Sequence, residues 1–272
     1  KFKQLGATQN ETIEGIRHDF LGVALPIRSC RSMLGIGIYG LYTPKDIERR
    51  SGANENNPYE PISPIEGYFM GYDIAVSGSY SIYLSKKFSI GTSIKMISQT
   101  IDVYSGYSAG IDLGGIYSFK DRFNIAAVMQ NIGPPLKFRE RAYQLPLNFK
   151  LGTSFGLTKF NTNFAFDISF PIDNYPISSI GMEISPIKII SLRTGYRYRV
   201  VGQEIDGLFG FSAGVGFDIS NFSLEYAFVP MGVLELTHRI SFKVAFGEIQ
   251  HVPRHAIKKL PGIAPKPEIA RK

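Results

Sequence analysis

The sequence predicts an all-β fold: a transmembrane β-barrel of fourteen antiparallel strands with both termini on the periplasmic side. Short segments alternate apolar and polar residues, and the connections between them alternate between brief and long. Between Phe209 and Ile219 every second residue is apolar, and the residues in between are Gly, Ser and Asp. A period of two indicates a strand with one apolar face. There is no apolar run near 18 residues, so a membrane-spanning helix is not expected.

Seven strands are predicted in the first half of the chain. They cover residues 3–9, 16–26, 33–42, 71–84, 88–101, 108–119 and 122–131. Each alternates, and the apolar positions of neighbouring strands form one continuous face. Its members are Ile74, Val76, Tyr80, Ile82, Ile90, Ile94, Met96, Ile111, Leu113 and Tyr117.

Seven more strands are predicted in the second half, over residues 147–157, 161–170, 179–185, 189–200, 208–219, 221–229 and 237–246. Their apolar face carries no charge over Phe149, Leu151, Phe155, Phe164, Phe166, Ile168, Leu192, Tyr196, Tyr198, Ile240, Phe242, Val244 and Phe246. This suits a lipid-facing band, where a midplane charge costs about 2–4 kcal/mol. Aromatic residues near strand ends predict interfacial girdles: Tyr42, Tyr72, Tyr117, Phe119, Tyr196 and Tyr198.

The connections indicate how the barrel is oriented. Those after even-numbered strands are short, at 27–32, 85–87, 120–121, 158–160, 186–188 and 220. Those after odd-numbered strands are mostly longer, at 43–70, 102–107, 132–146, 171–178 and 201–207. Outer-membrane barrels have short periplasmic turns and long outer loops, and bacterial barrels have an even number of strands. Both termini are therefore expected on the periplasmic side of an outer membrane in a diderm bacterium.

The opposite face carries acids and bases in nearly equal number. The expected lumenal ion-pair network consists of Asp73, Lys95, Asp112, Lys150, Asp167, Glu183, Arg193, Arg197, Asp218, Glu225, Arg239 and Lys243, with Arg199 on the same face. A balanced set favours pairing across strands, because each charge in a narrow lumen needs a partner to offset its desolvation. We therefore expect a filled or gated barrel rather than an open porin.

Composition argues against several other functions. The net charge is +7, but the basic residues are scattered, so nucleic-acid binding is not expected. Cys30 is the single cysteine and cannot form an internal disulfide. The histidines lie in unrelated contexts, so neither a metal site nor another cofactor is expected. No nucleophile–base–orienter set is recognisable, so the chain is not expected to be an enzyme.

The outer loops and the carboxyl-terminal tail are the expected contact regions. Candidate partner-docking residues are Lys45, Arg49 and Arg50 in the first long loop and Lys137, Arg139 and Arg141 in another, because functional residues concentrate in loops held by a rigid scaffold. The barrel domain is expected over 1–247, followed by a basic, proline-containing periplasmic tail over 248–272. No signal peptide is recognisable, so Lys1 is expected to be a processed or truncated start.

An ordered set of short motifs carries a family resemblance. The closing segments are Tyr-Ala-Phe-Val-Pro-Met-Gly (226–232) and Thr-His-Arg-Ile-Ser-Phe (237–242). Earlier segments are Leu-Gly-Val-Ala (21–24), Asp-Leu-Gly-Gly-Ile-Tyr (112–117), Gln-Asn-Ile-Gly-Pro-Pro-Leu-Lys-Phe (130–138), Pro-Leu-Asn-Phe-Lys-Leu-Gly (146–152) and Leu-Arg-Thr-Gly-Tyr (192–196). Together they resemble the PorV/PorQ family of outer-membrane barrels, which is similar to the long-chain fatty acid transporter fold.

The resemblance implies a non-enzymatic barrel in protein export or cell-surface assembly, as in type IX secretion, with loops and tail contacting partner proteins. The alternative is a transporter of hydrophobic small molecules such as fatty acids, since the fold relatives move such molecules through a lateral opening. A packed, charge-balanced lumen favours the first function, and the second needs an apolar path. A diffusion porin is the weakest of the three classes. Membrane lipid is expected around the barrel in every case.

Overall fold

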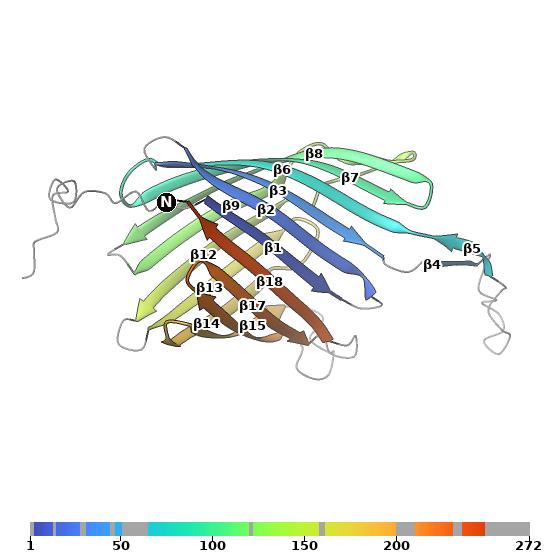
Figure 1. The fold of residues 1–272 in the computed structure, drawn as a ribbon. Coiled ribbons are helices and arrows are strands. Elements are labelled where there is room, and N and C mark those ends of the chain that lie inside the picture. Colours follow the sequence, from blue (N-terminus) through green and yellow to red (C-terminus); the bar gives the residue numbers. More distant parts are fainter. Residues whose placement is uncertain are drawn as a thin grey trace, which may run out of the picture.

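The structure, a computed structural model, describes residues 3–12, 15–27, 31–43, 47–50, 65–119, 122–157, 161–199, 210–230 and 236–247. Within them, fourteen strands form a closed barrel in the order β1-β18-β17-β16-β15-β14-β13-β12-β9-β8-β7-β6-β3-β2. Figure 1 shows the strands tilted steeply around the barrel axis. The fold class predicted from the sequence is confirmed.

The barrel strands match the fourteen predicted segments in order. In the first half they are β1 (Lys3–Glu11), β2 (Arg17–Ile27), β3 (Ser32–Tyr42), β6 (Gly71–Tyr83), β7 (Phe88–Ile101), β8 (Tyr104–Phe119) and β9 (Phe123–Ile132). In the second half they are β12 (Asn148–Leu157), β13 (Thr162–Pro171), β14 (Ile177–Ile187), β15 (Ile190–Arg199), β16 (Phe211–Ile219), β17 (Phe222–Pro230) and β18 (Leu236–Phe246).

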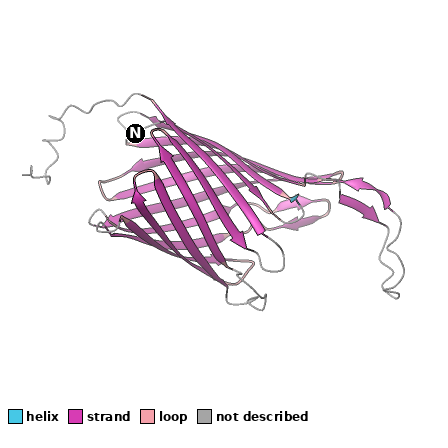
Figure 2. Ribbon diagram, turned by 60° about the horizontal axis from the view of Figure 1, so that its bottom comes forward, coloured by secondary structure: helices cyan, strands magenta, loops and turns pink. Residues whose placement is uncertain are grey.

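Antiparallel pairing of the first and last strands closes the barrel. The register runs from Lys3 opposite Phe246 to Glu11 opposite His238. Chain neighbours pair as antiparallel hairpins, including β1 with β2 and β17 with β18. Both β1 and β18 therefore have their terminal ends at the same end of the barrel, where the short turns lie. Figure 2 shows the wall from a second direction, with one hairpin standing away from it.

That separate hairpin and a second, smaller one lie within long connections. β4 (Ile47–Arg50) pairs with β5 (Ile65–Phe69) beyond the rim of the barrel (Figure 1). β10 (Leu136–Phe138) pairs with β11 (Arg141–Tyr143) between β9 and β12. Two-stranded pieces of three to five residues lack the long alternating pattern that reveals a barrel strand, so the sequence did not predict them.

The predicted loop over 102–107 is wrong. β7 and β8 instead continue as one long hairpin, joined at Asp102 and Val103, with Asp102 at a positive φ of 59°. Above the girdle their outward positions are polar, and Thr100 and Ser105 hydrogen-bond through their hydroxyls at 2.9 Å. An apolar outer face is needed only within lipid, so the alternation weakens where the hairpin leaves the membrane.

The exterior is apolar over most of its height. Large apolar side chains are exposed on every barrel strand except β1, and Ile36 and Met96 are 63% and 72% exposed. Near the short-turn end, Phe88, Tyr117, Phe119 and Phe123 form a chain of aromatic contacts with centroid separations of 4.6–6.5 Å. Among the described residues no helix is long and apolar enough to cross a membrane. Exposed apolar area of this extent requires a lipid environment.

A charge on the outer face will test the assignment of the two faces. Phe166 lies outward near the middle of β13, whereas the adjacent Ala165 faces the lumen opposite Ser154 and Gly181. We expect Phe166→Arg to destabilise the barrel by about 2–4 kcal/mol, because it places a cation in hydrocarbon. Ala165→Arg is the matched control and is expected to cost less. Reversible urea unfolding in phospholipid vesicles measures both, and equal losses would contradict the face assignment.

Candidate functional site

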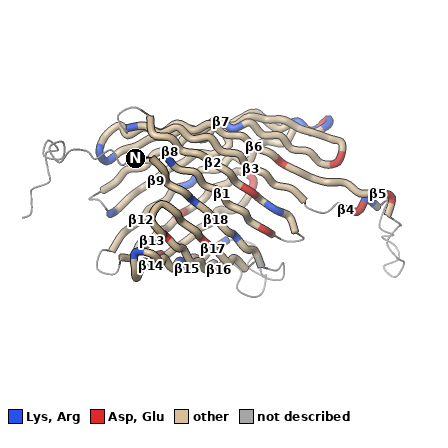
Figure 3. The backbone as a smooth tube through the Cα atoms, viewed as in Figure 1, with Lys and Arg blue, Asp and Glu red and all other residues tan. Residues whose placement is uncertain are grey.

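The twelve charged residues predicted to face the lumen all lie on the inner side of the wall. The pairing of neighbouring strands places them on the same face: for example, Glu183 lies opposite Arg193, and Lys243 lies opposite Ser223. Figure 3 shows basic and acidic residues spread along the strands between uncharged stretches, with more of them on β4–β5. A period of two puts all of them on one face once each strand is in register.

Arg193 is the centre of one ion-pair cluster. Its Nε lies 2.7 Å from Glu183 Oε2 and its Nη1 lies 3.1 Å from Glu225 Oε2. Glu225 belongs to β17, two strands from β15, and the two side chains meet over Gly216 of the intervening strand. A Cβ at Gly216 would lie 3.7 Å from Arg193 Nη1 and 3.8 Å from Glu225 Cγ. Asn163 Nδ2 also donates to Glu183 Oε1 at 3.2 Å.

Lys95 and Asp112 form a second cluster on the opposite part of the wall. Lys95 Nζ lies 2.8 Å from Asp112 Oδ1 and also donates to Asn131 Oδ1. The backbone N–H of Asn131 donates to Asp112 Oδ1 at 2.8 Å. Asn131 has a φ of 63°, and the β8–β9 register shifts between Ile111 and Leu113, so a bulge directs Asp112 to its partners.

The remaining lumenal charges have weaker or no partners. Asp73 accepts a hydrogen bond from Gln99 Nε2 at 3.2 Å, and Ser223 donates to Asp218 Oδ1. The part of the chain that the structure describes contains no ion pair within 4 Å for five others: Lys150, Asp167, Arg197, Arg239 and Lys243. The structure thus brings together two separate clusters. A lumenal role for the whole set stays a prediction.

A connection that the sequence presents as an outer loop packs against the inner face of β8. Leu136 and Leu145 are its anchors and are 6% and 8% exposed, unlike the other large apolar residues described. A Cβ at Gly106 would lie 2.6 Å from Leu136 Cδ2, and one at Gly110 would lie 3.4 Å from Leu145 Cδ1. The signal in the sequence that could have predicted this packing was a pair of leucines, Leu136 and Leu145, within an otherwise polar, proline-containing loop. A second signal was a pair of glycines, Gly106 and Gly110, at lumenal positions of β8.

The predicted docking residues lie in different settings. Lys45 lies outside the described residues, and Arg50 lies in β4. Arg49 Nη2 forms an ion pair with Asp102 Oδ2 at 2.5 Å, which links the β4–β5 hairpin to the β7–β8 tip. The Arg139 guanidinium lies 4.0 Å from the ring centroid of Tyr104. The other two, Lys137 and Arg141, are exposed on β10 and β11.

The predicted tail over 248–272 lies outside the described residues. Within the described ranges there is no group of three His, Cys, Asp or Glu residues arranged to hold a metal ion.

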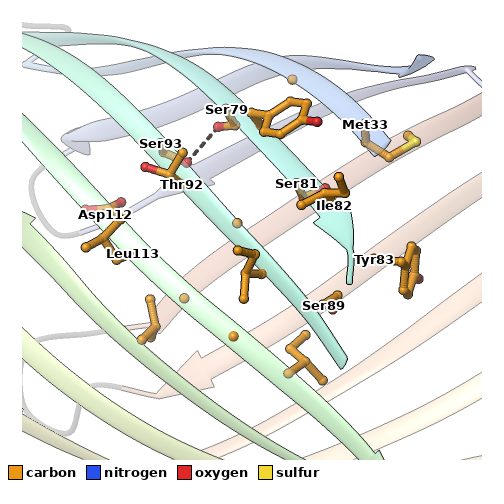
Figure 4. A pocket seen from close by; sticks show the side chains of 18 of the residues that line it. Met33, Ser79, Ser81, Ile82, Tyr83, Ser89, Thr92, Ser93, Asp112 and Leu113 are labelled. Atoms are coloured by element: carbon orange, nitrogen blue, oxygen red, sulfur yellow. Dashed lines mark hydrogen bonds between the residues drawn. The ribbon is translucent and has the colours of Figure 1, made fainter. Parts of the chain in front are cut away.

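The lumen contains a cavity of about 760 Å³ against β6, β7, β8 and β9. Figure 4 shows the side chains that line it, with serines and apolar residues intermixed. Ser79 and Ser93 share a hydrogen bond of 2.7 Å between their hydroxyls. Apolar walls come from Met33, Tyr83, Ile116 and Val128. The cavity can therefore hold an apolar molecule and contact a polar group on it.

An apolar hollow of about 720 Å³ lies on the lipid-facing side of the same wall. Its rim comprises Tyr80, Ile82, Phe88, Ile90, Leu113, Met129 and Phe149. The surface is recessed there because the outward residues at its centre are small, namely Thr92, Gly115 and Ala127.

The wall between these two spaces has no large side chain at its centre. Gly91 pairs with Gly114 on the lumenal face, and Gly115 pairs with Ala127 on the outer face. Gly114, Gly115, Ala127 and Val128 line both spaces. The barrier between lumen and lipid is thus little more than the backbone of β7, β8 and β9.

Comparisons with known proteins reveal structural relatives. No protein-family model and no curated protein sequence matches this chain. Its structure is similar to the Pseudomonas putida toluene transporter TodX, with 12% identity, 90% and 89% of the two chains covered and a TM-score of 0.61. For the Ralstonia pickettii toluene transporter TbuX these values are 13%, 91%, 90% and 0.64. For a Pseudomonas aeruginosa FadL homologue they are 10%, 90%, 90% and 0.57.

At such low identity these likenesses describe the fold, which is the FadL-type outer-membrane barrel. Together with the closed sheet and apolar exterior, this fold places the chain in the outer membrane of a diderm bacterium, as the sequence predicts. The resemblance to the transporter fold is confirmed. The narrower likeness to PorV/PorQ barrels and the association with type IX secretion gain no support from these structures.

Removing the cation of the first cluster will test its contribution. We expect Arg193→Leu to destabilise the barrel on the order of 1 kcal/mol, since it leaves Glu183 and Glu225 without their partner in a partly solvated lumen. Arg197→Leu is the control, from the same strand and face. Urea unfolding in vesicles measures stability. If Arg197→Leu loses as much stability as Arg193→Leu, the loss does not come from the ion-pair cluster.

Proposed function

We propose that this chain is a non-enzymatic outer-membrane passage for hydrophobic small molecules. The observation that carries the proposal is the pair of spaces on either side of the β7–β8–β9 wall. A cavity with apolar walls lies in the lumen, an apolar hollow lies in the exterior, and small residues separate them. A porin needs neither feature, because its solutes stay in an aqueous channel.

The lumenal cavity suits molecules that are mainly apolar and carry at most a small polar group. Its apolar lining, Met33 and Val128 among others, offers dispersion contacts and removes apolar surface from water. The hydroxyls of Ser79 and Ser93 bond to each other, so an apolar solute does not leave these two groups without a partner. TodX and TbuX are toluene transporters, which supports an apolar substrate class here.

The outer hollow supports a lateral path between lumen and membrane. An apolar solute gains little by re-entering water, so a route into hydrocarbon is preferred over one along the polar part of the lumen. Backbone pairing of β7 with β8 remains intact at Gly91 and Gly114, so passage requires a local opening of this pair. The small residues Gly91, Gly114, Gly115 and Ala127 lower the packing that such an opening must disrupt.

Protein export or surface assembly is the second candidate function. One observation favours it: the β4–β5 hairpin presents Ile47, Ile65 and Tyr68, 41–57% exposed, beyond the barrel rim. The Arg49–Asp102 ion pair holds this hairpin to the β7–β8 tip. A passage for small solutes does not need this surface. Loss of a specific co-purifying protein from the Tyr68→Ala variant, in mild detergent, would favour this function.

Filling the lumenal cavity will test passage. N-phenyl-1-naphthylamine is apolar and fluoresces when it enters the membranes of intact diderm cells. We expect the chain to raise its entry rate severalfold and Ser81→Phe to abolish the increase, because the ring occupies the cavity. Val76→Phe adds bulk on the lipid side of the same strand but lines neither space, so it is the matched control.

Hydrolysis of nitrocefin by a periplasmic β-lactamase distinguishes the classes in the same cells. It reports entry of a polar solute and is expected to stay unchanged. A rise in nitrocefin entry would favour a porin. Unchanged entry of both probes, with folded protein in the membrane, would contradict passage.

A further inference from the structure

The connection between β9 and β12, residues 133–147, lies over the part of β8 that leads outward from the lumenal cavity. Every second residue of β8 faces the lumen, and these positions fall into two groups. The inner group lines the cavity and consists of Asp112, Gly114 and Ile116. The outer group is covered by the connection and consists of Gly106, Ser108 and Gly110. On this wall, therefore, the cavity ends where the connection begins.

The connection fits closely onto β8 without joining the barrel sheet. The carbonyl oxygen of Pro134 accepts a hydrogen bond from Ser108 Oγ at 2.8 Å. A Cβ at Gly133 would collide with the carbonyl oxygen of Ala109, so the backbones can approach this closely only with glycine there. β10 nevertheless pairs with β11 in a sheet of its own. The connection can therefore leave the wall without breaking the backbone pairing of the barrel.

Asp112 anchors both ends of the connection. Its Oδ1 accepts the N–H of Asn131, just before the connection, at 2.8 Å, and Asn131 Nδ2 donates to the carbonyl oxygen of Pro146, near its end, at 2.8 Å. The Lys95 and Asp112 side chains are 16% and 19% exposed, against 28–46% for the other ion pairs in the part of the chain that is described. Losing one partner of such a pair is costly, so Asp112 holds the connection firmly.

We propose that the β9–β12 connection is a gate over the outer end of the lumenal cavity, and that Asp112 is the positioning residue that holds it closed. In the closed state Leu136 and Leu145 occupy the lumenal surface of β8 that a solute from outside would cross. Opening exposes a strip of small residues that leads to Gly114 in the cavity. The role of the gate in transport rests on the proposed passage, whereas its closure over the cavity does not.

Trypsin measures how often the connection leaves the wall. The connection contains Lys137, Arg139 and Arg141, and cleavage there requires the segment to detach and extend. We expect Asp112→Ala to speed this cleavage about tenfold, because it frees both ends of the connection. Asp218→Ala is the matched control, because Asp218 is a lumenal acid on β16 that bonds Ser223 and does not line the cavity. Mass spectrometry of fragments from the detergent-purified protein gives the rates.

Labelling of a cysteine in the cavity measures access from outside. Ser81 lines the cavity, so Ser81→Cys in a Cys30→Ser background is the reporter. The cationic reagent 2-(trimethylammonium)ethyl methanethiosulfonate is added to cells that lack general porins, so it reaches the barrel from outside. We expect Asp112→Ala to raise the labelling rate severalfold. Removing a carboxylate weakens the attraction of a cation, so faster labelling reports the open gate and not the change of charge.

A second variant removes an anchor of the gate without altering a barrel strand. Leu145→Ala is expected to speed both cleavage and labelling, and it decides the question if Asp112→Ala fails to fold. Heat-modifiable electrophoretic migration verifies folding. Labelling as slow in the folded gate variants as in the unmodified gate, or equal acceleration by Asp218→Ala, would overturn the proposal. Faster labelling without any entry of N-phenyl-1-naphthylamine would support the gate and contradict the passage.

Discussion

Backbone hydrogen bonding in hydrocarbon is the constraint on which the rest of this structure depends. An unpaired N–H or C=O costs several kcal/mol in lipid, so a sheet that crosses a membrane cannot keep an open edge. The pairing of β1 with β18 removes that edge. Once the sheet is closed, strand number and stagger fix the width of the lumen, and side chains must alternate between lipid and lumen. The apolar outer face and the charged lumenal face of this chain follow from that alternation.

The strands were predictable because each residue in the membrane meets one of two unlike environments. In β13, Phe164, Phe166 and Ile168 face lipid while Ala165 and Asp167 face the lumen, and this contrast is visible in the sequence. Where the β7–β8 hairpin leaves the membrane its outer face meets water and no longer needs apolar residues, so the alternation and the accuracy of prediction are lost together. The β10–β11 connection was difficult for another reason, because Leu136 packs against Gly106, a residue distant in the chain.

The sequence was enough to predict which face of the sheet carries the charged residues, but not which of them contact one another. Periodicity alone places Arg193 and Glu225 on the lumenal side. Their ion pair depends on the stagger of three neighbouring strands, which no local pattern reveals. The hollows were harder still, because a hollow is a run of small residues across neighbouring strands. Gly91, Gly114 and Ala127 are far apart in sequence and meet only through strand register.

A wall one strand thick also restricts how the length of this chain can change during evolution. Deleting one residue within β13 would send every residue on one side of the deletion to the opposite face, with Asp167 in lipid and Phe166 in the lumen. Two deleted residues keep the faces but shift the pairing with β12 and β14. Changes in length are therefore tolerated mainly in the connections. Homologous barrels should keep strand lengths and differ in their loops, so the loops are where new specificities can arise.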